Sequence, residues 1–245
     1  MSAAALKALH VPGKPLVLPN AWDADTAKLV EAAGFPVVAT SSVAVAAALG
    51  FADGEQAPAD EMFAAAARIA KAVGIPVTVD AESGYGLSGA ELAGRLLDAG
   101  AVGCNFEDTD HTTGAVRPVA EQVERIAALR EAAGDALVIN ARVDSFRGVD
   151  AKDALADGIA RAKAYLDAGA DCVYPIHLGA PDLIAEFVRE VGGAVNSAAW
   201  PGGPGLAGLA ELGVARISLG GGLRQYARKQ LGATLAGVAE GKLPY

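Results

Sequence analysis

The sequence predicts an α/β protein, a single (β/α)8 barrel. Eight short apolar segments bounded by turn residues recur along the 245 residues, and segments with helical periodicity lie between them. No linker-like shift in composition and no low-complexity block divides the chain, so we expect residues 1–245 to form one domain. A doubly wound open sheet has a similar alternation of strands and helices and is the alternative.

Each predicted strand is a run of apolar, often β-branched residues that ends in a turn signal. Along the chain these strands cover residues 16–20, 37–41, 77–81, 102–108, 137–144, 172–176, 194–198 and 215–220. Eight strand-then-helix units in 245 residues agree with a barrel in both number and size.

The predicted helices are rich in Ala, Leu, Glu and Arg, and their apolar residues recur at helical spacing. Clear examples cover residues 61–74, 89–100, 119–134 and 154–169. Several end in Gly just after the last apolar turn, where a helix C-cap favours it. The tail from Gly221 to Tyr245 is the last predicted helix, and we expect it to pack on a neighbouring subunit.

The composition limits the class of protein. An apolar content of 52% is enough for a continuous core. The two cysteines, Cys104 and Cys172, lie inside apolar strands, which argues against disulfides and Cys-rich metal sites and favours a cytoplasmic location. We expect neither a membrane span nor a signal peptide, because no apolar run reaches about 20 residues and the first ten residues lack a signal layout. A net charge of -9 disfavours nucleic acid as a partner.

Polar residues collect where the predicted strands end, which is where active sites of (β/α)8 barrels lie. They are Asn20, Asp23, Ser41, Ser42, Asp80, Glu82, Glu107, Asp108, Arg142, Asp144, His177 and Asn196. The strand bodies are otherwise mostly apolar, so this distribution predicts one site at the carboxyl end of the barrel.

The segment PVTVDAESGYG, residues 76–86, places two carboxylates at the mouth of the third strand. If the strand persists that far, Asp80 and Glu82 point the same way, and Glu107 meets them from the next strand. Such carboxylates raise one another's pKa unless a cation lies among them. With oxygen ligands only, the preferred ion is Mg²⁺, with Mn²⁺ as the alternative. The competing interpretation is that these acids cap helices or pair with arginines such as Arg142.

Arg142 lies near the end of the fifth predicted strand, with the same parity as Asn140 and Asp144. This position predicts a guanidinium above the same cavity, suited to a substrate carboxylate. A metal beside a carboxylate clamp suggests a small 2-oxo acid as the substrate. No lysine lies at a strand end, which disfavours a Schiff-base aldolase, and neither a nucleophile elbow nor a P-loop is present.

In combination, VDAESGYG, NFED around Glu107 and INARVDSF around Arg142 resemble the isocitrate lyase and phosphoenolpyruvate mutase superfamily. Two further stretches, NAWDADTAKLVEAAGFPVVATSS and GFAD ending at Asp53, extend the resemblance in the same order up to the sixth strand. The resemblance implies a Mg²⁺-dependent barrel that makes or cleaves C–C or P–C bonds next to an enolpyruvate unit. It also implies a homodimer or homotetramer with exchanged terminal helices.

The same resemblance implies roles for individual residues. Asp53, Asp80, Glu82 and Glu107 correspond to the family's Mg²⁺ site, with Asp80 as the direct ligand and the others acting through metal-bound water. Ser41 and Ser42 correspond to positions that hold the 2-oxo acid, and Arg142 to the position that holds its carboxylate. The family's Mg²⁺ bridges the keto oxygen and carboxylate of the substrate and stabilises an enolate.

Two departures from the family pattern bear on the reaction. Glu82 stands where Asp is commoner, and its longer side chain favours an indirect contact with the metal. The lyases of the family carry a loop Cys that acts as general acid or base, whereas this chain reads EDTDHTTGAVRPVAEQ, with neither that Cys nor the Lys and Asn of phosphonomutases. His111 in this loop is the predicted proton carrier, with an exposed loop histidine as the alternative interpretation. His177, after the sixth strand, is a predicted substrate contact.

The leading prediction is therefore a Mg²⁺-dependent lyase that cleaves a C–C bond of a small 2-oxo acid or hydroxy-dicarboxylate to leave an enolate on the metal. Two alternatives stay open. One is P–C chemistry, as in a phosphonomutase or phosphonopyruvate hydrolase. The other is a non-catalytic protein that binds a 2-oxo acid.

Overall fold

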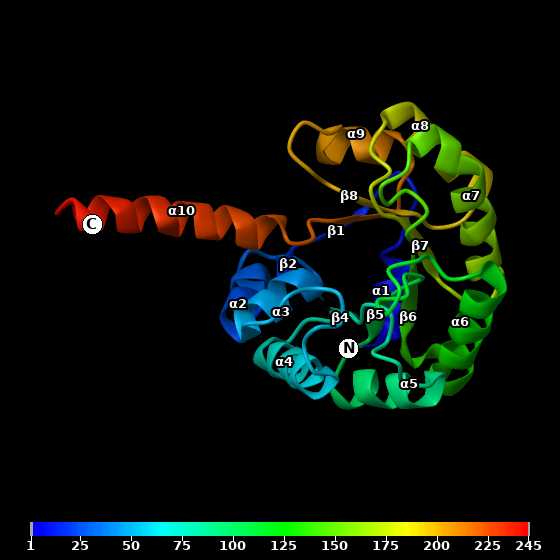
Figure 1. Cartoon of the computed structure of the whole chain (residues 1–245), viewed down its shortest axis with the longest axis horizontal. Coiled ribbons are helices and arrows are strands. Elements are labelled where there is room, and N and C mark those ends of the chain that lie inside the picture. Colours follow the sequence, from blue (N-terminus) through cyan, green and yellow to red (C-terminus); the bar gives the residue numbers. More distant parts are fainter. Residues whose placement is uncertain (1, 245) are drawn as a thin grey trace.

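The structure, a computed structural model, describes residues 2–244 and consists of parallel strands surrounded by helices (Figure 1). The strands are β1 (Leu16–Leu18), β2 (Asn20–Ala21), β3 (Val38–Thr40), β4 (Val77–Asp80), β5 (Gly103–Glu107), β6 (Val138–Val143), β7 (Cys172–Pro175), β8 (Asn196–Ala198) and β9 (Arg216–Ser218). The predicted (β/α)8 barrel is confirmed, because each predicted strand is present and neighbouring strands follow chain order.

Two parallel sheets make up the barrel wall. One has the order β2-β3-β4-β5-β6-β7 and the other the order β1-β9-β8. They meet at Pro19, between β1 and β2, and at a parallel bridge from Val173 to Val195. The predicted first strand, residues 16–20, is divided because Pro19 has no N–H to donate to a ladder.

The helices cover the outside of this wall. They are α1 (Ala3–Ala8), α2 (Ala24–Ala32), α3 (Ser42–Leu49), α4 (Ala59–Ala72), α5 (Gly89–Asp98), α6 (Val119–Ala133), α7 (Ala151–Asp167), α8 (Pro181–Val191), α9 (Gly205–Glu211) and α10 (Gly222–Ala239), with a short 3-10 turn, η1 (Gly134–Ala136). Capping boxes start α2 at Asp23 and α5 at Ser88, where side-chain oxygens accept the first free amides.

Helix α1 closes the amino-terminal end of the barrel. Leu6 is fully buried and packs with Leu16, Leu18 and Val138 in a small apolar cluster inside the wall. A Cβ on Gly103 would lie 2.9 Å from a Leu6 methyl, so this close packing requires glycine in β5. The barrel is therefore sealed at this end, and a small molecule must enter from the other.

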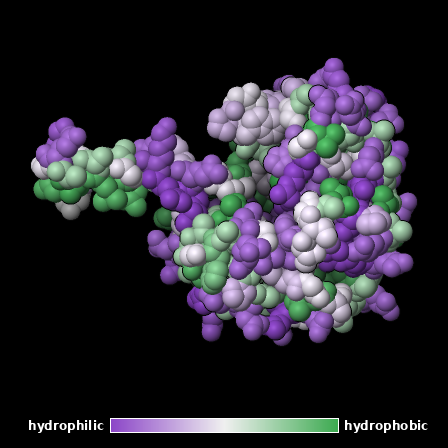
Figure 2. All heavy atoms as spheres, viewed as in Figure 1, coloured by the Kyte–Doolittle hydropathy of each residue, from purple (hydrophilic) through white to green (hydrophobic). Residues whose placement is uncertain are grey.

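Helix α10 projects away from the barrel (Figure 1), and none of its residues is buried. Apolar side chains lie along one face of this helix in Figure 2, and the exposed residues include Leu231, Leu235 and Val238. Within residues 2–244, no helix combines the length and the apolarity that crossing a bilayer requires.

Candidate active site

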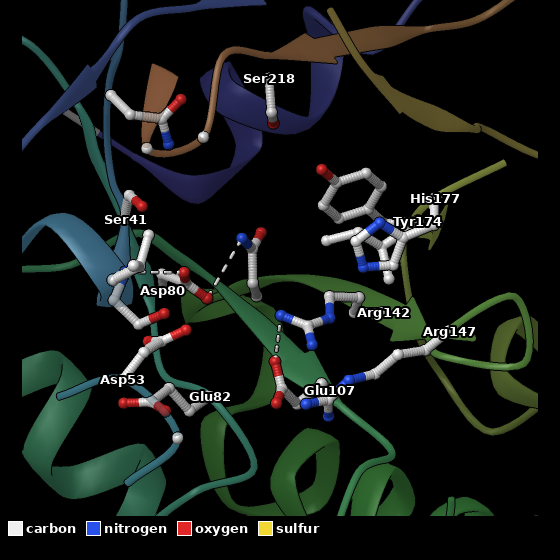
Figure 3. A pocket seen from close by; sticks show the side chains of 18 of the residues that line it. Ser41, Asp53, Asp80, Glu82, Glu107, Arg142, Arg147, Tyr174, His177 and Ser218 are labelled. Atoms are coloured by element: carbon white, nitrogen blue, oxygen red, sulfur yellow. Dashed lines mark hydrogen bonds and ion pairs between the residues drawn. The ribbon is translucent and has the colours of Figure 1, made fainter. Parts of the chain in front are cut away.

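A cavity of about 360 Å³ opens at the carboxyl ends of the strands. Every residue that the sequence analysis assigned a site role lines it, namely Ser41, Ser42, Asp53, Asp80, Glu82, Glu107, His111, Arg142 and His177. Figure 3 shows most of these side chains converging from separate strands and loops. The structure thus brings the nine residues together, while their individual roles stay predictions.

Asp80 is held in one orientation at the end of β4. Its Oδ2 accepts a hydrogen bond of 2.8 Å from the backbone N–H of Ser42, and its Oδ1 accepts one of 3.4 Å from Asn105 Nδ2. The backbone N–H of Asp80 itself donates to Thr40 Oγ1. Neutral donors, rather than a cationic side chain, therefore hold this carboxylate at the cavity wall.

Glu82 reaches the cavity by a different route from the one that strand alternation predicts. Strand β4 ends at Asp80, and Glu82 lies in the following turn with a φ of 48°. The hydroxyl of Tyr85 and the backbone N–H of Glu55 donate to its two oxygens at 2.7 Å each. Burial raises the pKa of Glu82 to about 6, and the charges of Asp80 and Asp53 add to this against the Tyr85 hydrogen bond.

Glu107 and Arg142 are adjacent on β5 and β6 and form a buried ion pair through Glu107 Oε2 and Arg142 Nη1. The guanidinium also donates to both oxygens of Asp144, at 2.6 and 2.7 Å. Arg142 thus pairs with acidic side chains, as the competing interpretation of the sequence expected. Its charge is largely used to hold Glu107 and Asp144, both of which are at most 2% exposed.

His111 lies over the cavity rather than in open solvent. Its Nε2 is 2.6 Å from Glu107 Oε1, and 13% of its side chain is exposed. The short loop that carries it is closed by a bridge between Thr109 and Val116. The hydrogen bond to Glu107 raises the pKa of His111, while burial raises the pKa of Glu107 against the opposing effect of Arg142. The two side chains are therefore placed to share a proton.

The side of the cavity opposite Asp80 is cationic. Arg147, in the loop after β6, reaches the cavity beside Arg142 (Figure 3). Within the described residues it forms no ion pair. His177 also faces the cavity, with a φ of 68°, and burial, followed by the charge of Arg142, lowers its pKa. A left-handed backbone at a non-glycine residue is strained and is often retained at a binding site.

Sequence reasoning missed Arg147, Asn105, Tyr174 and Ser218, all of which line the cavity. Strand alternation could have found two of them. Asn105 lies two residues before Glu107, and Tyr174 lies two residues before the end of the predicted strand at residue 176, so each shares the inward face with a position at the mouth of the barrel. Arg147 had none, since it follows β6 in a loop whose direction no periodicity reveals.

The donor set fits a hard divalent cation that keeps part of its water shell. Asp53, Asp80, Glu82 and Glu107 supply only oxygen, and burial, followed by the charges of Asp80 and Asp53, raises the pKa of Glu82. Across residues 2–244, however, no three His, Cys, Asp or Glu side chains lie close enough together to ligate one metal directly. One direct carboxylate ligand with water-mediated contacts from the other acids stays a prediction for this site.

The family model and the most similar named relatives point to one protein family. The family model described as phosphoenolpyruvate phosphomutase matches residues 6–239. An uncharacterised protein of Mycobacterium tuberculosis is 36% identical over 212 residues, which cover 86% of this chain and 80% of the relative. A probable 2-methylisocitrate lyase of Corynebacterium glutamicum is 39% identical over 181 residues, covering 70% of this chain and 57% of the lyase.

Solved structures agree. A Burkholderia cenocepacia protein provisionally named a phosphonomutase superimposes with a TM-score of 0.89 at 43% identity, covering 96% of this chain and 99% of that one. A phosphonopyruvate hydrolase in complex with oxalate and Mg²⁺ superimposes with a TM-score of 0.86 at 26% identity, covering 99% and 89% of the two chains. The named relatives are thus lyases, mutases and hydrolases, and one of them binds Mg²⁺.

Proposed function

This chain belongs to the phosphoenolpyruvate phosphomutase family, and from that premise we propose that it is a Mg²⁺-dependent carbon–carbon lyase. The substrate is a small 2-oxo acid or hydroxy-dicarboxylate, whose cleavage leaves an enolate that is then protonated. One observation carries the proposal: four carboxylates and two arginines line one cavity, and one of these carboxylates, Glu107, contacts both Arg142 and His111.

The carboxylate side would hold the cation. Asp80 would be the direct ligand, because Ser42 and Asn105 already fix its orientation. Asp53, Glu82 and Glu107 would accept hydrogen bonds from water on the cation. When bound, the cation supplies Lewis-acid stabilisation of the oxyanion that develops during cleavage.

The cationic side would hold the anionic groups of the substrate. Arg142 is committed to Glu107 and Asp144, so the guanidinium with most free N–H donors is that of Arg147. We assign Arg147 the second anionic group of the substrate, which a bidentate fork recognises well. The rest of the substrate would lie against Ser41, His177 and the remaining N–H groups of Arg142.

The proton reaches the enolate from His111. Its imidazole faces the cavity, and the hydrogen bond to Glu107 raises the pKa of His111, which favours the protonated ring. Glu107 keeps the ring oriented and compensates its charge. The loop that carries His111 also covers this edge of the cavity, which limits the access of water.

P–C bond cleavage is the second candidate, and the 43% identity to a provisionally named phosphonomutase favours it. A phosphoryl group carries more negative charge than a carboxylate and would draw more heavily on Arg147. The third candidate is a non-catalytic protein that binds a 2-oxo acid.

The test is proton exchange of pyruvate in D₂O, followed through the methyl signal by ¹H NMR. We expect exchange with Mg²⁺ that stops on addition of EDTA. Binding of pyruvate without exchange would instead indicate a binding protein. A panel of oxaloacetate, alkylmalates, 2-methylisocitrate and phosphonopyruvate then separates C–C from P–C cleavage by the products formed.

A pair of variants in one loop assigns the proton donor. His111→Gln should slow exchange by about 10²-fold or more, which is the usual contribution of a general acid or base. Thr113→Val lies two residues away and is exposed, so it should leave the rate unchanged. Equal rates in the two variants would remove His111 from the reaction.

We propose that residues 1–245 form one domain and that the protein is a homodimer or homotetramer in which α10 packs on a neighbouring copy. The exposed stripe Leu231, Leu235 and Val238 supports this, because an isolated amphipathic helix needs a partner for its apolar face. Leu231→Lys should lower the molar mass measured by light scattering. Lys229→Glu, on the opposite face, is the control and should leave it unchanged.

A further inference from the structure

Arg216 is a buried cation without a counter-ion. It lies on β9 inside the barrel and is 1% exposed. Within the described residues it forms no ion pair, and its Nε and Nη1 have no hydrogen-bond partner. Burying an uncompensated charge is among the most costly arrangements in a protein interior, and burial lowers the pKa of this guanidinium accordingly. Such a cost indicates a function at this position.

The position of Arg216 is directly beneath the cavity. It shares the inward face of β9 with Ser218, two residues further along, and Ser218 lines the cavity. On the neighbouring strands its register partners are Asn196 and Leu16. Leu16 belongs to the apolar cluster at the sealed end of the barrel, so Arg216 lies between that cluster and the cavity floor.

A single hydrogen bond connects Arg216 to the floor. Its Nη2 donates to Asn105 Oδ1 at 3.0 Å, and Asn140 Nδ2 donates to the same oxygen at 2.8 Å. Both groups that face Oδ1 are hydrogen-bond donors. If the Asn105 amide were flipped, its NH₂ group would face these donors and no hydrogen bond could form. The Nδ2 group of Asn105 is therefore directed to Asp80 and the cavity.

We propose that Arg216 is a positioning residue that directs the Asn105 amide into the cavity and places a fixed positive charge beneath the anion that binds there. The charge acts together with the cation site above it, because the interior of the barrel is water-poor and screens it weakly. This inference rests on the proposed function only in that the ligand is a small carboxylate anion.

The test compares a dianion with a monoanion of nearly the same shape. Oxalate and oxamate are titrated by calorimetry into the wild-type protein in the presence of Mg²⁺, and the ratio of their dissociation constants measures the preference for the second negative charge. Arg216→Lys keeps a charge and a donor, Arg216→Gln keeps a donor alone, and Arg216→Met keeps neither. Leu16→Met, beside Arg216 in the pairing, is the control for altered packing.

We expect the preference for oxalate to fall by about tenfold in Arg216→Gln and Arg216→Met, which is the size of one charge-assisted interaction. Arg216→Lys should restore most of it, and Leu16→Met should leave it unchanged. Without ligand, Arg216→Met should melt at the wild-type temperature or above, because it removes a buried uncompensated charge. A residue that served only the fold would show the reverse, a lower melting temperature and an unchanged preference.

The outcomes separate the two proposals. If the wild type binds neither anion, the proposed function fails, and the role of Arg216 fails with it. If the wild type prefers oxalate and the Gln variant does so equally, the role of Arg216 alone is overturned. Should Arg216→Met not fold, the Lys and Gln variants still compare a charged donor with a neutral one, and equal preferences in these two would overturn the inference.

Discussion

Replacing Arg142 by Met should destabilise the protein strongly, because it leaves two buried carboxylates without their cation. In the structure, the guanidinium of Arg142 contacts Glu107 on one side and both oxygens of Asp144 on the other. Methionine keeps much of the volume and none of the charge. The variant therefore isolates the electrostatic contribution of the group from its packing.

The magnitude follows from burial. Glu107 is 2% exposed and Asp144 is fully buried. Removing one partner of a buried ion pair typically costs about 3 to 5 kcal/mol of unfolding free energy. For a chain of this length that corresponds to a fall in melting temperature of about 10 °C. Melting is measured at one protein concentration, because an oligomer is stabilised by mass action.

The pH dependence distinguishes this cause from a packing defect. In the wild type, burial alone would raise the pKa of Asp144, but the hydrogen bonds and charge of Arg142 hold it below its usual value. That stabilisation is present above the unfolded pKa and is lost as pH falls through the folded one. In Arg142→Met the pKa values of Glu107 and Asp144 should both rise on folding, so the variant should gain stability relative to the wild type as pH falls from 8 to 5.

The double variant Arg142→Met with Asp144→Asn is the internal control, since it removes one of the stranded charges and should recover part of the loss. A cost below about 1 kcal/mol that is equal at pH 5 and pH 8 would refute the reasoning. It would mean that the guanidinium does not compensate these carboxylates.

Three further predictions concern the cation site, the substrate and acid stability. Asp80→Ala should abolish Mg²⁺-dependent exchange of pyruvate protons with little change in melting temperature, because Asp80 is held by neutral donors only; residual exchange sensitive to EDTA would assign the cation to other ligands. Arg147→Gln should raise KM for a dicarboxylate about tenfold while changing kcat little, since the guanidinium is expected to bind a group remote from the reacting bond; an unchanged KM would place that group elsewhere. His10→Gln should reduce acid sensitivity, because burial, followed by the charge of Arg216, lowers the pKa of His10 to about 4. As pH falls, His10 is protonated in the unfolded chain before it is protonated in the native protein. The native histidine therefore lowers the free energy of unfolding by about 2 kcal/mol at pH 5 and by almost nothing at pH 7.5. Equal melting temperatures of the two proteins at pH 5 would contradict a lowered pKa of His10.

The barrel could be predicted from the sequence because its elements are local. The strand Cys172–Pro175 and the helix Ala151–Asp167 are each specified by their own apolar periodicity, and a parallel strand order follows from their alternation. Pro19 divides the first predicted strand into β1 and β2. The sequence shows the proline, but whether it interrupts a strand depends on whether a neighbouring strand would accept a hydrogen bond at that position.

The membership of the cavity was also predictable, for a general reason. Residues that end parallel strands of one barrel must face the same opening, so Asp80, Glu107 and Arg142 had to meet there. The roles of these residues were less accessible. The sequence left open whether Arg142 pairs with the acids or holds a substrate carboxylate. The structure shows its pairs with Glu107 and Asp144, and its contact with the substrate stays a prediction.

Sequence by itself determined the parallel barrel, the family motifs and the set of acids at the mouth of the strands, because these depend on period, spacing and residue type along the chain. Tertiary structure alone decided which charges are already paired. Whether a guanidinium faces a carboxylate, like that of Arg142, or none, like that of Arg216, depends on distances between strands far apart in the sequence. No pattern within one segment encodes those distances, since they arise only when the barrel wall closes around its interior.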